Sequence, residues 1–476
     1  MKHGNFDRRK FIKSSSAILA ATTIPLNAFG QNILKVRPEW QAFKTTSHYD
    51  SLLKAISLMK SNTNPSDANS WAYWTNVHLN YCPHSVSYFL AWHRGYLYYF
   101  ERQLRAVSGD NQLILPYWDY YSYATLPGEF TNPTSGNPLY VERVNTNVQQ
   151  ALTLAPFSPN IFNFPTGANN AFEPSFEGAP HNQLHNIVGN VMATMSSPID
   201  PIFWLHHANV DRLWVAWVNA GGRRKMPAIT KPYWNGKHTY ASSLSMLRTS
   251  TYSTRTTLGY RYSSETFPTQ LPVAQVTGSN IMRVQAALSS QPGSSPPVGP
   301  FHISGPRQTS EKTFSVGGAL NVGLDNKSIS AQLPVGAEHS RALAQIAAGQ
   351  TASIPGNSKY YRSAHIVFDN IEVSEAGKKG GYFYKVYLNI LSAKGVPIQP
   401  ANIYIGSMGP FEVNAASHHA GGHVQLRYPV KEALSGASIK GLGMMSVSFV
   451  RVNGDQSPAG PMIGLGEVRV DLSTED

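Results

Sequence analysis

Histidines at metal-ligand spacing occur in two stretches of this 476-residue sequence. In the later stretch, His181 and His185 stand four residues apart, so a helix places both imidazoles on one face, one turn apart. A second helix is predicted to begin at Asp200, a suitable N-cap, and carries His206 and His207. A lone buried histidine is usually a hydrogen-bonded core residue. Two histidines from one helix and a third from its neighbour instead indicate a three-imidazole metal site.

An earlier stretch supplies a second set of histidines. His78 and His84 flank the chain's only cysteine, Cys82, and His93 lies on an amphipathic helix predicted over 87–105. Two such triplets, with no carboxylate at ligand spacing, indicate a metal that prefers imidazole. Di-iron bundles use glutamates and Glu-x-x-His pairs, which this pattern lacks. The residues therefore indicate copper first and zinc second.

Both stretches resemble the two copper motifs of the tyrosinase, catechol oxidase and haemocyanin family of type-3 copper proteins. The resemblance is carried by NVHLNYC at 76–82, FLAWHR at 89–94 and DPIFWLHH at 200–207. LPYWDY at 115–120 is similar to an aromatic connector of the family, and LGYRY at 258–262 to its closing Tyr-x-Tyr motif.

The resemblance implies two copper ions that bind O2 between them, each held by three imidazoles. The implied ligands of one copper are His78, His84 and His93, and those of the other are His181, His185 and His207. Spacing alone leaves His206 and His207 open as the sixth ligand, and the family pattern selects the second. Phe203 matches the phenylalanine that presses on the coppers in this family.

Three further positions bear on the reaction that the resemblance implies. Glu177 matches a water-holding glutamate of plant relatives, and Asn182 completes a pair that orients a water to take a phenol's proton. The alternatives are that Glu177 faces solvent and that Asn182 only caps a turn. Thr194 matches the gate position, where threonine leaves the metal more open than an aromatic side chain does. These features favour monophenol hydroxylation beside diphenol oxidation.

Cys82 is predicted to be joined to the His84 ring by a thioether, a bond that plant and fungal relatives carry. The alternative is a buried, inert thiol. With one cysteine, the sequence offers no internal disulfide. Asn209 and Asp211 are candidate acceptors that fix the imidazoles' orientation. The alternative for Asp211 is an ordinary salt bridge with an arginine.

Residues 1–30 are predicted to be a twin-arginine signal peptide, with Arg8 and Arg9 before an apolar stretch. Export by that route to the periplasm or outside a bacterial cell would follow the loading of metal into a folded protein. The alternative is a disordered basic start. No other segment is apolar enough to predict a membrane span. The net charge of +12 is spread along the chain, so nucleic-acid binding is not predicted.

The predicted architecture has two parts after the signal peptide. Residues 31–265 form a mainly α catalytic domain, a four-helix bundle around the dinuclear copper site, and 266–300 form a linker. Residues 301–476 form a β-sandwich, because alternating runs such as 364–368 and 382–388 are typical of strands. This sandwich resembles the C-terminal domain of plant polyphenol oxidases.

The sandwich is predicted to cover the copper pair and keep the enzyme latent. A loop is expected over 404–411, punctuated by glycine and proline, with Met408 and Phe411 as candidate plugs of the phenol pocket. The alternative is a β-domain that binds a partner, with Phe411 in its own core.

We therefore interpret the sequence as a polyphenol oxidase that uses O2 to oxidise o-diphenols to o-quinones and also hydroxylates monophenols. Small phenols and O2 are its expected partners, and no oligomeric state is predicted. An o-aminophenol oxidase and a pure catechol oxidase are the alternatives, ahead of an O2 carrier and a zinc hydrolase.

Overall fold

The computed structural model describes residues 34–272 and 310–475, with gaps at 393, 420–423, 436–438 and 440–441. The predicted signal peptide and most of the predicted linker lie outside the described residues. From Lys35 onward the described residues belong to one compact unit. We call 34–272 the helical domain and the described residues from 310 on the C-terminal sandwich.

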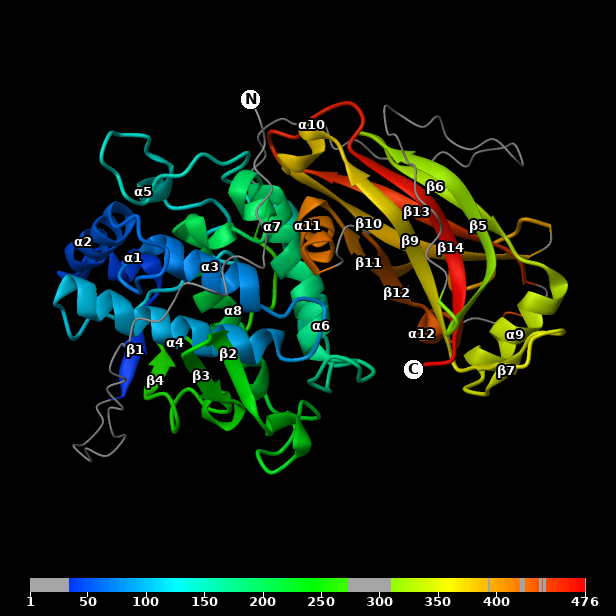
Figure 1. The fold of residues 1–476 in the computed structure, drawn as a ribbon, viewed down its shortest axis with the longest axis horizontal. Coiled ribbons are helices and arrows are strands. Elements are labelled where there is room, and N and C mark those ends of the chain that lie inside the picture. Colours follow the sequence, from blue (N-terminus) through cyan, green and yellow to red (C-terminus); the bar gives the residue numbers. More distant parts are fainter. Residues whose placement is uncertain are drawn as a thin grey trace, which may run out of the picture. The chain divides into compact units, whose positions relative to one another are not determined.

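The helical domain contains eight α-helices and four short strands among its described residues (Figure 1). Its helices are α1 (Trp40–Phe43), α2 (His48–Ser61), α3 (Trp71–Tyr81), α4 (Phe89–Ser108), α5 (Gly128–Thr131), α6 (Phe172–Phe176), α7 (Gln183–Val188) and α8 (Ile202–Asn219). Its strands are β1 (Lys35–Arg37), β2 (Lys237–Ala241), β3 (Leu244–Leu247) and β4 (Tyr260–Tyr262). Its short 3-10 helices include η2 (Gln149–Ala151), η3 (Ala155–Phe157), η6 (Ser197–Ile199), η7 (Pro232–Trp234) and η8 (Arg248–Thr251).

Local sequence explains where the histidine-bearing helices start and stop. Ser70 caps α3 by accepting the amide of Ala72 through its side chain. Helix α4 ends at Gly109, whose φ of 78° is a left-handed conformation that glycine adopts readily. The carboxylate of Asp200 accepts the amide of Ile202 at 2.9 Å and so caps α8, as predicted.

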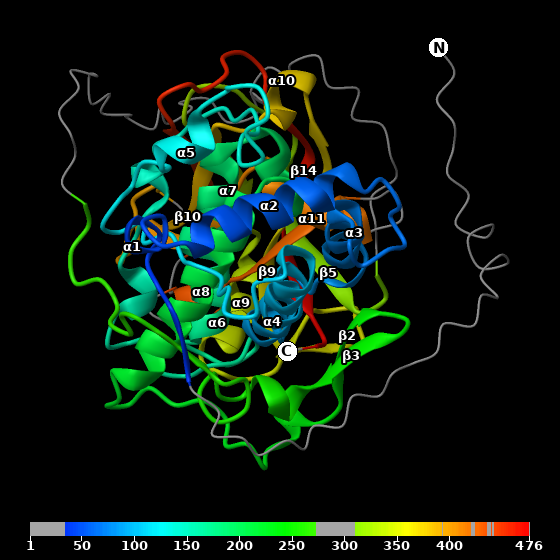
Figure 2. The ribbon, with the colours of Figure 1, turned by 90° about the vertical axis from the view of Figure 1, so that its left-hand side faces the viewer.

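Helix α4 packs against both α2 and α8, and Figure 2 shows this group from the side of α2 and α3. Nearly every residue of α8 is buried, in an aromatic core to which Trp204, Trp214 and Trp217 belong. The predicted four-helix arrangement around the histidines is confirmed, because α3, α4, α8 and α7 with the turn before it carry all of them except His84, which lies in the loop after α3.

Two four-stranded antiparallel sheets form the C-terminal sandwich, which confirms the predicted fold. One sheet has the order β11-β10-β13-β6 and the other β12-β9-β14-β5. The strands are β5 (Thr313–Leu324), β6 (Ile329–Pro334), β7 (Ala352–Ser353), β8 (Tyr360–Tyr361), β9 (Ser363–Val373), β10 (Tyr382–Ser392), β11 (Ile403–Met408), β12 (Leu426–Pro429), β13 (Leu442–Asn453) and β14 (Ile463–Ser473). The helices are α9 (Ala337–Ala347), α10 (Glu375–Lys378), α11 (Pro410–His419) and α12 (Lys431–Ser435). Phe368 of β9 and Phe449 of β13 meet between the sheets, with ring centroids 5.2 Å apart.

The expected loop over 404–411 is wrong. Most of this stretch belongs to β11, which pairs with β10, and Pro410 begins α11. Proline suits the first turn of a helix, where its missing N–H has no intrahelical partner. The Gly and Pro that predicted a loop therefore mark a strand followed directly by a helix.

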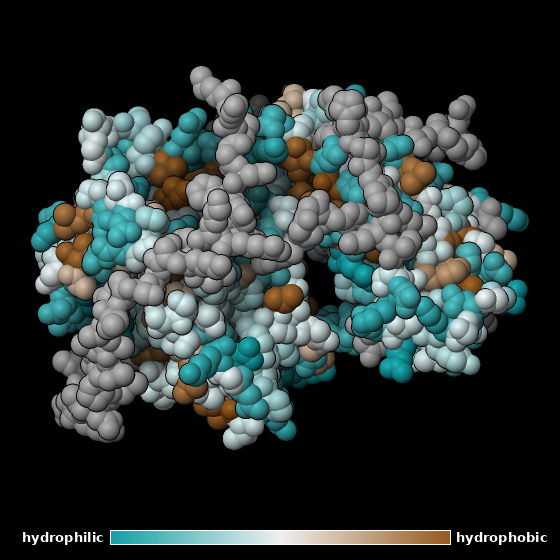
Figure 3. Space-filling view, viewed as in Figure 1, coloured by the Kyte–Doolittle hydropathy of each residue, from teal (hydrophilic) through white to brown (hydrophobic). Residues whose placement is uncertain are grey.

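Hydrophobic residues on the face shown in Figure 3 lie in small groups between hydrophilic ones. Among the described residues, no helix combines the length and the apolar character that crossing a membrane requires.

Candidate metal centre

The first histidine group joins α3, the loop that follows it, and α4. One potential ligand atom from each of His78, Cys82, His84 and His93 lies within 4.8 Å of the others. The Nδ1 of His78 donates to the carbonyl of Met195 at 2.8 Å, and that of His93 to the carbonyl of Phe89 at 2.7 Å. These bonds fix both rings and leave Nε2 for a metal. Among the described residues, the buried Nε2 of His78 has no hydrogen-bond partner.

The second group comes from η4 (Glu177–Asn182), a π-helical turn, and from α7 and α8. Its four buried histidines again lie within 4.8 Å of one another by one ring nitrogen each: His181, His185, His206 and His207. The segment before α7 is kinked at Ala179, which is extended with φ −157° and ψ 127°, but this kink precedes His181, and the backbone is helical at Asn182 and Gln183. His181 and His207 still bring their Nε2 atoms to 3.3 Å from each other.

The two groups face each other across α4 and α8. The rings of His93 and His207 stack with centroids 4.2 Å apart, and His84 lies 6.1 Å from His181 by the same measure. Phe203 contacts histidines of both groups, with ring centroids 5.1 Å from His78 and 4.2 Å from His207. The geometry therefore places two three-imidazole sets side by side, as a dinuclear centre requires.

His206 and His207 differ in what they contact. His207 touches the first group through His93, whereas His206 stacks on His181 at 5.2 Å and lies 5.6 Å from Tyr120. Neither ring nitrogen of His206 has a hydrogen-bond partner among the described residues. Of these two histidines, His207 is the one with a ring contact to the first group among the described residues, and it is also the one that the family pattern selects.

Burial keeps these imidazoles neutral, the form that binds metal. It lowers the pKa of His78 to about 4 and that of His181 to about 3. The same cause brings the pKa of His93, His185 and His207 well below the usual value. Neutral buried nitrogens without a carboxylate ligand suit copper or zinc, so the residues fit the predicted metal pair.

Backbone carbonyls orient His78, His93 and His185, and among the described residues no hydrogen bond joins Asn209 or Asp211 to any of these three rings. His185 donates from Nδ1 to the carbonyl of Met192 at 2.7 Å. Asn209 accepts from Arg212 at 2.7 Å, and Asp211 pairs with Arg94, so the salt-bridge alternative for Asp211 is correct.

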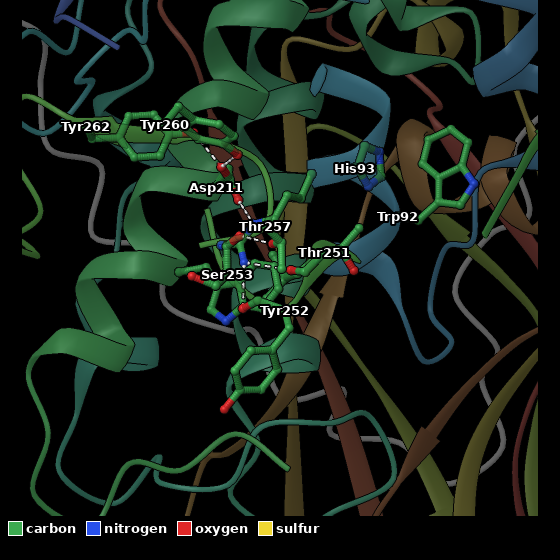
Figure 4. Close-up of polar contacts among 12 residues, drawn as sticks. Trp92, His93, Asp211, Thr251, Tyr252, Ser253, Thr257, Tyr260 and Tyr262 are labelled. Carbon is green, nitrogen blue, oxygen red and sulfur yellow. Dashed lines mark hydrogen bonds and ion pairs between the residues drawn. The ribbon is translucent and has the colours of Figure 1, made fainter. Parts of the chain in front are cut away.

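Asp211 is the centre of a buried polar cluster beside the histidines (Figure 4). Its carboxylate accepts from Arg94 at 2.6 Å, Tyr260 at 2.6 Å and Tyr262 at 2.5 Å. Arg94 directly follows His93 on α4, and Asp211 lies one turn after His207 on α8. The cluster therefore connects α4 and α8, which carry His93 and His207, to β4.

Glu177 and Glu173 hold the loop that carries His84. Glu177 is 3% exposed, which excludes the solvent-facing alternative, and its Oε1 accepts the amide of Ser85 at 2.6 Å. Glu173 accepts the amide of Leu90 at 3.2 Å, at the start of α4. Burial raises the pKa of Glu173 to about 7 and that of Glu177 well above its usual value. Glu173 was not predicted as a site residue, because nothing in its spacing from the histidines distinguishes it from other glutamates.

Asn182 and Thr194 have different surroundings. Asn182 is buried, and its Oδ1 accepts from Nδ1 of His181 at 2.8 Å, so it orients a histidine directly. Thr194 is half-buried after η5 (Asn190–Ala193), and its hydroxyl donates to the carbonyl of Val191 at 2.8 Å.

Cys82 is a buried free thiol in this structure. Its Sγ lies 3.3 Å from Nδ1 and 3.9 Å from Nε2 of His84. It also lies 3.4 Å from Nε2 of His93. Burial raises the pKa of the thiol well above its usual value.

The two candidate plugs lie in different places. Phe411 stacks on His185 with ring centroids 4.2 Å apart and an interplanar angle of 18°, and it contacts His84 at 5.4 Å. Met408 is fully buried in the core between the two sheets, so the proposal of Met408 as a plug is wrong. The alternative that Phe411 belongs to the sandwich core is also wrong.

Comparisons with known proteins point to one family. The model of the common central domain of tyrosinase matches residues 56–153 and 131–220. A tyrosinase of Streptomyces glaucescens is 32% identical over 194 residues, which are 31% of this chain and 69% of that protein. Tyrosinase HcTyr1 of a Hahella species is also 32% identical, over 181 residues, and the match spans 30% of this chain but only 39% of that protein.

One solved structure resembles nearly the whole chain. A latent apple tyrosinase superposes with a TM-score of 0.51 over 94% of this chain and 99% of its own, at 19% sequence identity. This likeness supports the fold, a helical domain followed by a sheet-rich one.

Proposed function

This chain belongs to the tyrosinase family, and on that premise we propose that it is a copper polyphenol oxidase that converts o-diphenols to o-quinones with O2. The observation that carries the proposal is the pair of facing, fully buried imidazole groups without a carboxylate ligand. The residues that would hold the two coppers are His78, His84 and His93, and His181, His185 and His207. When bound, the copper pair supplies O2 activation and takes up the electrons of the phenol.

Monophenol hydroxylation is the finer part of the proposal. Asn182 and Glu177 would hold a water that takes the phenol's proton, and the burial of both side chains beside the histidines supports this proposal. Asn182→Gly should lower monophenol hydroxylation more than diphenol oxidation. Thr194→Phe, which narrows the entrance, should impair bulky substrates of both kinds. Equal losses on both substrates in Asn182→Gly would contradict a role in proton removal.

The decisive experiment is oxygen uptake by the copper-loaded protein with a monophenol, an o-diphenol and an o-aminophenol. Uptake with the o-diphenol supports the proposal, and uptake with the monophenol separates a tyrosinase from a pure catechol oxidase. A preference for the o-aminophenol would favour that alternative enzyme. Reversible O2 binding without turnover of any substrate would mean an O2 carrier, and activity with zinc alone would mean a hydrolase.

We further propose that the C-terminal sandwich keeps the enzyme latent by placing Phe411 against His185. Phe411→Gly in the full chain should raise diphenol oxidation, as should proteolytic cleavage near 290–300. Tyr360→Gly is a matched control, because Tyr360 is an exposed aromatic residue of the same sandwich. Full activity of the uncut wild-type chain would rule latency out.

The thioether between Cys82 and His84 remains a proposal supported by their proximity. Its formation makes a bond between Sγ and a ring carbon and breaks one S–H and one C–H bond. The two hydrogens with their electrons pass to O2, which leaves as hydrogen peroxide. The copper-loaded protein should then be lighter by two hydrogens and resist alkylation after denaturation, whereas complete alkylation of Cys82 would refute the bond.

Export by the twin-arginine route is likewise proposed from the sequence. Replacing Arg8 and Arg9 by lysine should retain the protein in the cytoplasm, and unchanged export would refute the assignment.

A further inference from the structure

One short segment, residues 190–195, orients one histidine in each of the two histidine groups. The carbonyl of Met195 accepts from Nδ1 of His78 at 2.8 Å, and the carbonyl of Met192 accepts from Nδ1 of His185 at 2.7 Å. Both carbonyls belong to 190–195, which consists of η5 and the two residues after it. Since the bond at Nδ1 sets the ring orientation and directs Nε2 to the metal, the position of this segment controls one ligand of each set.

The C-terminal sandwich holds this segment at both ends. At one end, the carbonyl of Lys379 accepts the amide of Asn190 at 2.6 Å. At the other, Oδ1 of Asn414 on α11 accepts the amide of Met195 at 2.8 Å. Met195 thus links a side chain of the sandwich to His78, because its N–H donates to Asn414 and its carbonyl accepts from His78.

Helix α11, which carries Asn414, is itself fixed beside the second group. Asn186, the residue after His185, is fully buried and donates to Glu412 at 2.7 Å, and its Oδ1 accepts the amide of Phe411 at 2.9 Å. Gly409 fits against this side chain so closely that a Cβ would lie 2.5 Å from it. These bonds fix α11 beside the histidine groups in one position. Asn414, which lies on α11, cannot move to another position unless they break.

We propose that Asn414 is a positioning residue of the metal centre, through which the C-terminal sandwich orients His78 by way of Met195. The sandwich is then a structural part of the site that holds copper, in addition to a cover over it. This inference rests on the proposed copper function, and it assigns to Asn414 an effect on metal retention that a cover alone would not have.

The test is the rate at which a copper chelator strips the copper-loaded full chain, followed by metal analysis. Loss of the acceptor in Asn414→Ala should make one of the two coppers leave about fivefold faster, the equivalent of one hydrogen bond. This is less than the roughly 10–100-fold effect of removing a direct partner of a ligand. Asn414→Asp retains an acceptor oxygen and should restore slow release.

Ser417→Ala is the matched control, since Ser417 lies on the same helix, is exposed and bonds only within it among the described residues. Gly409→Ala should lift α11 and speed release without touching Asn414, and thermal unfolding would verify that each variant is folded. Release at the wild-type rate in Asn414→Ala, or equally fast release in its Ala and Asp variants, would overturn the inference. A wild-type chain that binds no copper would instead refute the proposed function.

Discussion

Removal of the negative charge at Asp211 should be among the most damaging single changes in the helical domain. The Asp211→Asn variant keeps the shape of the side chain but replaces one acceptor oxygen by an NH2 group. In the wild type the carboxylate accepts from Arg94, Tyr260 and Tyr262, and Arg37 lies 3.8 Å away. An amide cannot accept from all of these donors, and its NH2 would face a guanidinium.

The magnitude follows from burial. The side chains of Asp211 and Arg94 are each 3% exposed, so the variant leaves a buried cation without its counter-charge. Breaking a buried pair in this way costs ~3–5 kcal/mol of the free energy of unfolding. Arg255→Gln offers a matched control, because Arg255 is 49% exposed in its pair with Glu265 and such a pair is worth at most ~1 kcal/mol.

The assay is urea unfolding of the metal-free chain, followed by tryptophan fluorescence, with the denaturation midpoints of both variants compared with the wild type. Copper content after loading is a second readout. The pair of Asp211 on α8 with Arg94 on α4 joins the two helices close to His207 and His93. A destabilisation of Asp211→Asn no larger than that of Arg255→Gln would refute the reasoning that this cluster stabilises the domain.

Two further changes test the packing around the histidines. Burial raises the pKa of Glu173 from 4.5 to about 7. The contribution of this group to the free energy of unfolding is therefore full below pH 4.5. It is lost as the pH rises through about 7, with a slope of ~1.4 kcal/mol per pH unit. Glu173→Gln should remove this slope and stabilise the protein at pH 8, measured by thermal unfolding, and an unchanged slope would exclude Glu173 as its source. Gly95→Ala, which normally strengthens a helix by ~1 kcal/mol, should instead destabilise this one because its Cβ would lie 1.9 Å from the buried hydroxyl of Tyr240. A raised melting temperature would contradict that clash.

Side-chain type and spacing predicted two histidine groups, whereas the ligand sets and the choice of His207 over His206 came from the family resemblance. Imidazole is the neutral side chain that best binds copper, so the histidines alone indicated the kind of site. The helical patterns around them placed His78, His93, His181 and His207 on inward faces. The acceptors that orient them could not be predicted in the same way. Met192 and Met195 act through backbone carbonyls, which every residue has, so only the folded chain shows which are used.

The fold around 404–411 shows a different limit. Gly406 was interpreted as a turn residue, but it lies in β11, where a Cβ would come within 2.6 Å of the ring of Tyr428. Its role is a close approach between strands of the two sheets, β11 and β12, a use of glycine that a sequence pattern does not separate from a turn. Pro410 was interpreted as a break and instead begins α11. Gly406 therefore lies inside a strand and Pro410 starts a helix, and only the folded chain separates these meanings from a loop.

The position of α11 makes access to the site and retention of its metal oppose each other. Phe411 and Asn414 lie about one turn apart on this helix, one against His185 and the other bonded to Met195. Any movement that lifts the phenylalanine away from the histidines also withdraws the acceptor that holds His78 through its carbonyl partner. If both proposals hold, the chain that becomes active on cleavage is also the one that loses copper faster.

Replacing Phe411 alone separates the two effects, because glycine there opens the site while Asn414 stays in place. We therefore expect Phe411→Gly to raise diphenol oxidation while copper release stays near the wild-type rate. Release as fast as in Asn414→Ala would mean that the contact of Phe411 with His185 and the bond of Asn414 to Met195 cannot be separated.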